Sequence, residues 1–335
     1  MVRVNVAAQL NRLSLTSDQS MAQIEVALLG FGNVGRALSR YIETSHSIPI
    51  PIHIKGIADR SGGVFPGDSQ LHRLIAHKES GRTVAEFAAG ETLSAEEFVR
   101  ALPRAGVSLL VESLPTNIVD GEPALGLITS ALQQGTNVVT VDKGPLVHGL
   151  APLMKAARKA GVQIAYGGTT GVSVPDGLDQ VLEIRGVLNG TSNYVLSEMQ
   201  QHQTSFQDAL DAARSDGIAE PDPTLDIEGW DTASKILILA NALMGANARL
   251  CDVSRTGIGP QTESLIEIAR KTGRIVRLVG RARRWQGRVR VSVAPKLVTS
   301  DSPFYAVSGT SKAAIFRTES RGAVLALARS GRDAI

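Results

Sequence analysis

A short apolar run followed directly by a glycine-rich hexapeptide limits the fold of this chain more than any other feature. Residues 24–29 form the run, and a stretch of helical composition follows the hexapeptide up to residue 43. In dinucleotide-binding folds the first glycine permits a tight turn, the second lets a pyrophosphate approach the backbone, and the third lets helix and strand pack closely. The free amides at the helix N-terminus then bind the phosphates. The sequence therefore predicts a strand, a loop and a helix, with the loop residues binding a dinucleotide: Gly30, Phe31, Gly32, Asn33, Val34 and Gly35.

A second strand-like run, residues 52–58, ends in a residue pair that bears on the choice of dinucleotide. The pair is Asp59 and Arg60. An acidic residue at this place suits the ribose hydroxyls of NAD, whereas a nearby arginine accommodates the 2′-phosphate of NADP. Because the chain carries both residues, NAD and NADP both stay open as cofactors. The alternative that the glycine loop binds another phosphate, or none, also stays open.

Further apolar runs alternate with helical stretches and predict a doubly wound parallel sheet. The runs cover residues 108–111 and 138–141, and the helical stretches cover residues 122–134 and 150–160. Such alternation is typical of an α/β fold of Rossmann type. Ligands in these sheets bind beyond the carboxyl ends of the strands. We therefore expect a second group of residues beside the cofactor: Leu114, Pro115, Thr116 and Lys143.

Length and composition indicate a soluble protein of two domains. The chain has 335 residues, a net charge of +3 and one cysteine, Cys251, so it carries no internal disulfide. No apolar run reaches the roughly 20 residues that span a bilayer. Residues 1–20 lack the features of a secretory signal, so we expect a cytoplasmic protein. We interpret these residues either as a disordered extension or as a segment before the true start at Met21. A basic cluster at residues 281–290 lies beside Trp285, a combination that can bind nucleic acid. Because residues 288–293 alternate between polar and apolar, we interpret the cluster as a solvated sheet face instead.

An acidic block that ends in one lysine is the candidate site for chemistry. Apolar residues at helical spacing predict a helix that begins near Ile227 and ends at Gly245. Asp231 and Lys235 then share one helical face. The alternative is an exposed acidic loop with an ordinary surface ion pair. Because the helix is otherwise strongly apolar, we expect the lysine to be partly desolvated, and such a lysine beside carboxylates is a candidate for proton transfer.

Four stretches, taken in order, resemble homoserine dehydrogenase over most of residues 24–318. They are the glycine loop at 30–35 and the segments at 138–145, 189–194 and 220–235. The last segment is the specific one, because its glutamate, aspartate and lysine stand at the family's mutual spacings. The resemblance implies NAD(P)-dependent interconversion of L-homoserine and L-aspartate 4-semialdehyde, a step toward threonine and methionine.

The resemblance also implies roles for individual residues. Lys235 matches the family's proton-transfer lysine, and Lys143 matches its second lysine, beside cofactor and substrate. Glu220 and Asp231 match the carboxylates that hold the substrate's amino group and orient the lysine, and Asp226 matches a further acidic position lining the site. Two more residues would border the substrate and offer backbone amides to its carboxylate: Gly190 and Thr191.

The family layout implies a nucleotide-binding domain over residues 21–150 and an α+β catalytic and dimerisation domain with a mixed sheet over 151–303. The chain would return after about residue 303 to complete the first domain, although the glycine-rich end expected there is shortened. A homodimer is implied, with a tetramer as the alternative. No stretch remains for an appended regulatory domain.

Several departures from the family pattern leave alternatives open. Asp142 stands where the family has asparagine, and Gly167 where a glutamate often lies near a Na+ or K+ ion. Backbone carbonyls could still hold that ion, at Thr170, Val172 and Val174.

Because the C-terminal end is shortened, a non-catalytic sensor of NAD(P) or homoserine is the main alternative function. A semialdehyde dehydrogenase would need a nucleophilic cysteine, but Cys251 has no histidine nearby in the sequence and we expect it to be buried.

Overall fold

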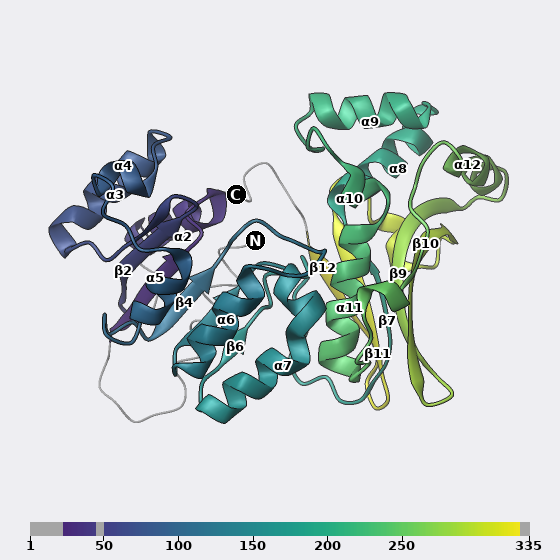
Figure 1. Ribbon diagram of the computed structural model, residues 1–335. Coiled ribbons are helices and arrows are strands. Elements are labelled where there is room, and N and C mark those ends of the chain that lie inside the picture. The colour runs from purple at the N-terminus through teal and green to yellow at the C-terminus, as the bar shows by residue number, and fades with distance from the viewer. Residues whose placement is uncertain (1–22, 45–49, 329–335) are drawn as a thin grey trace. The chain divides into compact units, whose positions relative to one another are not determined.

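The computed structural model describes residues 23–44 and 50–328, and these residues form two compact units. The units divide between Thr169 and Thr170, and each is built around one six-stranded sheet (Figure 1). This confirms the predicted α/β class. The expectations for residues 1–20, for a start at Met21 and for the chain beyond residue 328 lie outside the described residues.

The first sheet has the strand order β3-β2-β1-β4-β5-β6. All neighbours are parallel except β2 and β3, which pair antiparallel. From β1 the chain proceeds to β2 and β3 on one side, and β4, β5 and β6 are added on the other, so the order reverses between β1 and β4. The strands are β1 (Ile24–Leu29), β2 (Ile52–Asp59), β3 (Gly62–Val64), β4 (Leu109–Glu112), β5 (Asn137–Thr140) and β6 (Ile164–Ala165).

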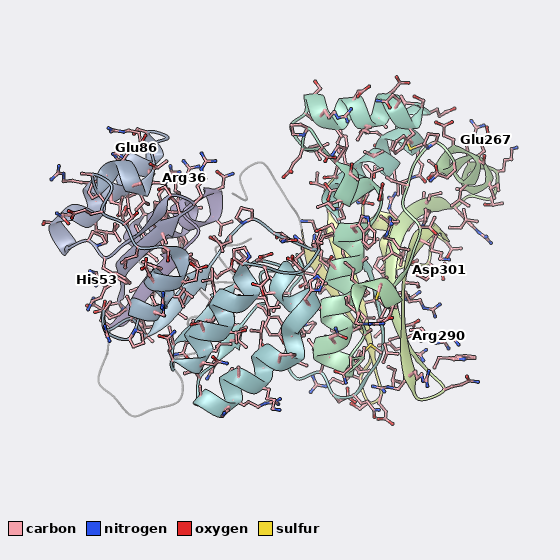
Figure 2. The ribbon with its side chains drawn as sticks, viewed as in Figure 1. Arg36, His53, Glu86, Glu267, Arg290 and Asp301 are labelled. Carbon is pink, nitrogen blue, oxygen red and sulfur yellow. The ribbon has the colours of Figure 1, made fainter. Side chains whose placement is uncertain are left out.

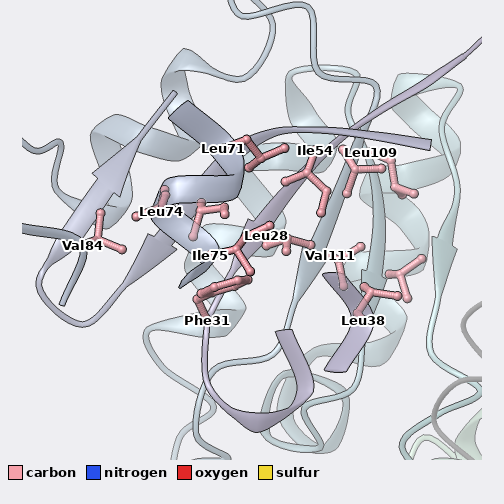
Figure 3. Close-up of a cluster of buried hydrophobic side chains, with 13 residues drawn as sticks. Leu28, Phe31, Leu38, Ile54, Leu71, Leu74, Ile75, Val84, Leu109 and Val111 are labelled. Atoms are coloured by element: carbon pink, nitrogen blue, oxygen red, sulfur yellow. The ribbon is translucent and has the colours of Figure 1, made fainter. Parts of the chain in front are cut away.

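Helices connect the parallel strands of this sheet, as the predicted alternation requires. Capping boxes at Thr83 and Ser94 begin two of the helices, and Gly161, at φ 70°, ends another. Buried apolar side chains from strands and helices form a common core, to which Leu28 of β1 and Leu74 of α3 both belong (Figure 3). The helices are α2 (Asn33–Thr44), α3 (Asp68–Glu79), α4 (Val84–Phe87), α5 (Ala95–Ala101), α6 (Ala124–Gln133) and α7 (Gly144–Ala160).

The second sheet is mixed, as predicted, with the order β12-β11-β7-β9-β10-β8. Its neighbours are antiparallel except β8 and β10. The basic cluster lies on β9 and β10, where Arg281 pairs with Glu183 and Arg290 is exposed (Figure 2). The strands are β7 (Val181–Val187), β8 (Ser254–Arg255), β9 (Ile275–Trp285), β10 (Arg288–Val298), β11 (Lys312–Thr318) and β12 (Gly322–Ala328).

The central helix of the second unit is α11 (Trp230–Met244), which packs on β7, β9 and β10. Gly280 on β9 permits this approach, because a Cβ atom there would lie 3.1 Å from Thr232 Cγ2 and 3.2 Å from Ile236 Cβ. The other helical elements are α8 (Gly190–His202), α9 (Phe206–Ser215), α10 (Thr224–Ile227), α12 (Thr262–Lys271) and the short 3-10 helices η1 (Leu250–Asp252) and η2 (Pro303–Ala306).

The predicted single helix from Ile227 to Gly245 is wrong at its start. The chain instead forms α10, breaks, and begins α11 at Trp230. Gly229 causes the break, because its φ of 82° lies in the left-handed region that glycine tolerates best. A side chain there would also crowd Val293, whose Cγ1 would lie 3.3 Å from the added Cβ. Gly245 ends the helix as predicted, at φ 61°.

Two expectations about the domains also differ from the structure. The boundary lies at residues 169–170 rather than near 150, because α7 continues to Ala160 and β6 then pairs with β5 in the first sheet. Residues 303–328 do not complete the first unit. They form η2, β11 and β12, and β11 pairs with β7 in the second sheet.

A buried carboxyl group lies at the carboxyl end of β4. Glu112 is fully buried, accepts a hydrogen bond of 2.5 Å from the Thr140 hydroxyl at the end of β5, and accepts another of 2.7 Å from the Leu114 amide. Burial raises the pKa of Glu112 to about 7, the nearby Asp142 adds to the rise, and the two hydrogen bonds oppose it. The Glu112 carboxyl group therefore stays protonated up to a higher pH in the folded protein than in the unfolded chain.

We expect Glu112→Gln to be more stable than the wild type at pH 8, by up to about 3 kcal/mol, since one pKa unit corresponds to roughly 1.4 kcal/mol. The folded pKa is raised, so the wild type loses this stability as pH rises from the unfolded value, about 4.5, to about 7. The difference between the two proteins should vanish near pH 4.5. Urea unfolding at pH 4.5, 6 and 8 measures it, with the exposed Glu91→Gln as the control. Equal stability at pH 8 would contradict the inference.

Candidate active site

The glycine loop of the first unit has the geometry that its three glycines predict. Gly30 has a φ of 97°, and a Cβ atom there would lie 2.6 Å from the backbone carbonyl of Ser113. At Gly35 an added Cβ would lie 2.5 Å from the Gly30 oxygen, whereas at Gly32 it would meet nothing within 4 Å. The first and third glycines therefore serve the turn and the packing, and the second leaves the backbone open to a ligand.

The other loop residues differ in what they can offer a dinucleotide. The Phe31 side chain is buried in the core of the first unit, so only its backbone is available (Figure 3). Val34 is half-buried. Asn33 is exposed, and its Oδ1 accepts a hydrogen bond of 2.8 Å from Arg36, which Figure 2 labels.

The segment after β4 lies beside this loop, as predicted from the sheet topology. The Ser113 hydroxyl donates a hydrogen bond of 2.8 Å to the Gly30 carbonyl. Leu114 is half-buried and its amide is held by Glu112, whereas Pro115 and Thr116 are exposed. The glycine loop and this segment meet at the carboxyl ends of β1 and β4, where the strand order reverses and where such sheets bind their ligands.

Asp59 does not have the free carboxylate that ribose binding requires. Its Oδ1 accepts hydrogen bonds from the Ser61 amide (2.8 Å) and hydroxyl (2.5 Å), and its Oδ2 accepts from the Val84 amide (3.2 Å) and from Lys78. Burial disfavours the ionised form, but the hydrogen bonds from Lys78, Ser61 and Val84 outweigh it and lower the pKa. The next residue, Arg60, is exposed.

The segment after β5 supplies Asp142 and Lys143 at the start of α7. Asp142 is buried, and its Oδ1 accepts a hydrogen bond of 2.9 Å from the Gly144 amide. Burial raises the pKa of Asp142, while the Gly144 amide, Thr116 and Lys143 oppose the rise. Lys143 is half-buried and precedes the first residue of the helix. This carboxylate is the departure from the family's asparagine noted in the sequence.

In the second unit, Lys235 is buried and hydrogen-bonded on α11. The residue is 8% exposed, and its Nζ donates to Asp231 Oδ2 at 2.5 Å and to the Leu188 carbonyl at 3.0 Å. The predicted shared helical face is thus confirmed, and the alternative of a solvated surface pair is wrong. A charged pair this deeply buried requires close hydrogen-bond partners, and the structure provides them.

Asn189 links two carboxylates of this site, and sequence reasoning assigned it no role. Its Nδ2 donates to Asp226 Oδ1 at 2.5 Å and to Asp231 Oδ2 at 2.9 Å. Its Oδ1 accepts from the Ser192 amide at 2.7 Å, so Asn189 caps α8. The asparagine directly before the helical run was the available signal, since asparagine is a preferred N-cap residue.

The environment of the Asp226 carboxyl group disfavours its ionised form. Burial raises its pKa, and the negative charge of Asp231 raises it further. Hydrogen bonds from Asn189 and Thr191, and the positive charge of Lys235, act in the opposite direction. Asp226 and Asp231 therefore compete for the same positive partners, and an additional cation would be bound favourably here.

The remaining predicted substrate residues of this unit are only partly brought together. Gly190 and Thr191 form the first turn of α8, next to Asn189, and the Thr191 hydroxyl donates to the Ile218 carbonyl at 3.3 Å. Glu220 is exposed and, within residues 23–44 and 50–328, forms no hydrogen bond or ion pair with a side chain of this site. Its predicted role therefore stays a prediction.

The predictions about metals and cysteine chemistry have different outcomes. The Val172 carbonyl accepts a hydrogen bond of 2.9 Å from the Thr170 hydroxyl. A Na+ or K+ ion held by the carbonyls of Thr170, Val172 and Val174 would have to share the Val172 oxygen with that hydroxyl. The ion stays a prediction. The described part of the chain has no metal-binding group of three His, Cys, Asp or Glu residues.

Cys251 is exposed, which corrects the expectation that it is buried. No helix among the described residues is long and apolar enough to cross a membrane.

Known proteins resemble this chain over almost its whole length. A sequence model of the homoserine dehydrogenase family matches residues 175–334. The homoserine dehydrogenase of Methanocaldococcus jannaschii is 32% identical and aligns with 91% of this chain and 93% of its own length. The NAD(+)-dependent homoserine dehydrogenase of Pseudomonas canavaninivorans is 35% identical, with 91% and 90% covered.

Solved structures show the same likeness. A hyperthermophilic archaeal homoserine dehydrogenase in complex with NADPH superposes with a TM-score of 0.74 at 27% identity, covering 92% of both chains. A homoserine dehydrogenase from Thiobacillus denitrificans gives a TM-score of 0.75 at 26% identity, covering 94% of this chain and 70% of the other. This chain therefore belongs to the homoserine dehydrogenase family, a family of NAD(P)-dependent oxidoreductases.

Proposed function

We propose that this protein interconverts L-homoserine and L-aspartate 4-semialdehyde with NAD or NADP, in the route to threonine and methionine. The observation that carries the proposal is the buried Lys235 on α11, hydrogen-bonded to Asp231 and to the Leu188 carbonyl. Family membership supports the same reaction. The bound nicotinamide would supply or accept the hydride.

Lys235 is the proton-transfer group in this proposal. Its ammonium protonates the carbonyl oxygen when the aldehyde is reduced, and its neutral amine takes the hydroxyl proton in reverse. Asp231 orients the lysine through the 2.5 Å hydrogen bond, and the Leu188 carbonyl fixes a second N–H direction. One N–H of the ammonium is then left for the substrate oxygen, because a lysine ammonium has three donors.

The carboxylates beside Lys235 suit the amino group of the substrate. Asp226 and Asp231 are held near each other by the Asn189 amide, and together they carry more negative charge than Lys235 neutralises. A substrate ammonium would restore the balance. Glu220 would join them if its exposed side chain turned inward, and Gly190 and Thr191 would border the substrate. Lys143, in the first unit, is proposed beside the cofactor.

The two rival functions explain the second unit less well. A sensor of NAD(P) or homoserine has no use for a lysine whose burial must be offset by Asp231, Asn189 and a backbone carbonyl. A semialdehyde dehydrogenase that forms an acyl-thioester needs an activated cysteine. Cys251 lies in η1, and its Sγ contacts Asp252 Oδ1 at 3.9 Å, which is longer than the hydrogen bond by which an adjacent base activates a nucleophile.

We expect Lys235→Met to lower kcat for homoserine oxidation by at least about 100-fold, because general acid–base assistance typically contributes 10²–10⁴-fold. Binding of NADP+ should change little, since Lys235 lies in the second unit. Initial rates of NADPH formation and fluorescence titration of the cofactor measure the two effects. The exposed Lys271→Met is the matched control. Unchanged turnover together with lost cofactor binding would refute the proposed role.

We further propose that NADP is the preferred cofactor. The Asp59 carboxylate is occupied by Ser61, Lys78 and Val84, so it has little capacity left for ribose hydroxyls. The exposed Arg60 beside it can bind a 2′-phosphate, which a guanidinium does well. Relatives do not decide the matter, because one is named NAD(+)-dependent and another was solved with NADPH.

Arg60→Ala should weaken NADP+ binding by about 10- to 100-fold, the size of a lost hydrogen bond to a charged group. Binding of NAD+, which lacks the 2′-phosphate, should change less than twofold. Calorimetric titration of both cofactors tests this, with the exposed Arg104→Ala of the same unit as the control. Tighter binding of NAD+ than of NADP+ by the wild type would overturn the preference.

A homodimer, with a tetramer as the alternative, also stays our proposal. Strand β12 is an edge strand of the second sheet, and it exposes Leu325 (43%) and Leu327 (65%). Exposed apolar residues on an edge strand favour pairing with another chain.

Leu327→Lys should therefore shift the protein toward the monomer, because pairing would bury the added charge. Light scattering after gel filtration gives the mass at several concentrations. Val119→Lys, at a residue that is 83% exposed in the first unit, is the control. A wild type that is monomeric at all concentrations would exclude the dimer.

A further inference from the structure

A second lysine lies close to Lys235, although the two residues are far apart in the sequence. Lys312 begins β11, and both lysine side chains lie close to Gly171. A Cβ atom placed on Gly171 would lie 3.7 Å from Nζ of Lys235 and 3.7 Å from Nζ of Lys312. The two ammonium groups therefore lie, at most, twice that distance apart.

The stem of Lys312 also passes the start of α8. A Cβ atom on Gly190 would lie 3.6 Å from Cε of Lys312. Gly190 is the first residue of α8, whose N-terminus carries unpaired amides and partial positive charge. Lys312 is only half-buried. The lysine and the helix terminus thus provide positive charge at the same place.

Helix α8 fixes the segment that leads to Lys312. Asn193 is buried, and its Nδ2 donates to the carbonyls of Val307 (3.2 Å), Gly309 (2.9 Å) and Ser311 (3.1 Å). The Gly309 amide donates to the Ser197 hydroxyl at 3.2 Å. These bonds hold the chain directly before β11, so the position of Lys312 beside Gly190 is set before any ligand binds.

The charges of the site assign a role to this lysine. The proposed substrate is a zwitterion, and its ammonium is accounted for by Asp226 and Asp231. Lys235 is already engaged by Asp231 and by the reacting oxygen, so it cannot also serve the substrate's carboxylate. We propose that Lys312 binds the α-carboxylate of the substrate and makes the enzyme select amino acids over amino alcohols. This inference rests on the proposed function of the same site.

Two small competitors of homoserine separate this role from a merely structural one. L-2-Aminobutanoate keeps the amino and carboxylate groups, whereas 3-aminopropan-1-ol keeps the amino and hydroxyl groups and lacks the carboxylate. Lys312→Gln should raise KM for L-homoserine and the inhibition constant of L-2-aminobutanoate by about 10- to 100-fold, as expected for a lost charged hydrogen bond. The inhibition constant of 3-aminopropan-1-ol should change less than twofold.

Further variants make the outcome decisive. Lys312→Arg keeps the charge and should restore most of the affinity for L-2-aminobutanoate, and Lys271→Gln is a control for losing a lysine elsewhere in the same unit. Equal weakening of both competitors, or weaker binding of NADP+ alone, would overturn the proposal. If the wild type fails to oxidise homoserine, the proposed function fails. Calorimetric titration of the wild type and Lys312→Gln with L-2-aminobutanoate would then still test the carboxylate site.

Discussion

The buried ion pair between Lys235 and Asp231 is the interaction on which the second unit depends. Removing both charges from water is costly, and their attraction offsets that cost only if good geometry and further hydrogen bonds are present. The Leu188 carbonyl at the end of β7 and the Asn189 amide at the start of α8 supply those bonds. The apolar face of α11 packs on the same sheet and holds the lysine in place. The demands of one charged pair thus explain why a strand end and the start of a helix meet beside α11.

The first unit shows that carboxylates at strand ends can serve the fold rather than the ligand. Asp59, at the end of β2, joins the start of α4 to Lys78 of α3. Glu112, at the end of β4, is held by Thr140 at the end of β5 and by the Leu114 amide. These bonds fix the ends of neighbouring strands, so the glycine loop and the segment after β4 meet in a defined position.

Local patterns predicted much of this structure because the relevant forces act over a few residues. The glycine spacing at 30–35 fixed a strand, a loop and a helix, and the spacing of Asp231 and Lys235 placed both on one face of α11. The same reasoning failed at Gly229, where a left-handed residue splits the expected helix. It also failed at residues 303–328, because pairing of β11 with β7 joins segments that are far apart in the sequence.

By itself, the sequence determined the class of fold, the glycine loop between the first strand and helix, and the identity of the buried lysine, since each follows from periodicity or short-range spacing. Only the tertiary structure decided which charged groups are free to bind ligands. In the folded chain, the Asp59 carboxylate accepts hydrogen bonds from Lys78 and Val84. Folding also places Asn189 beside Asp226, and Lys312 near Lys235. These contacts depend on strand pairing and helix packing between distant segments, which no local pattern of residues records.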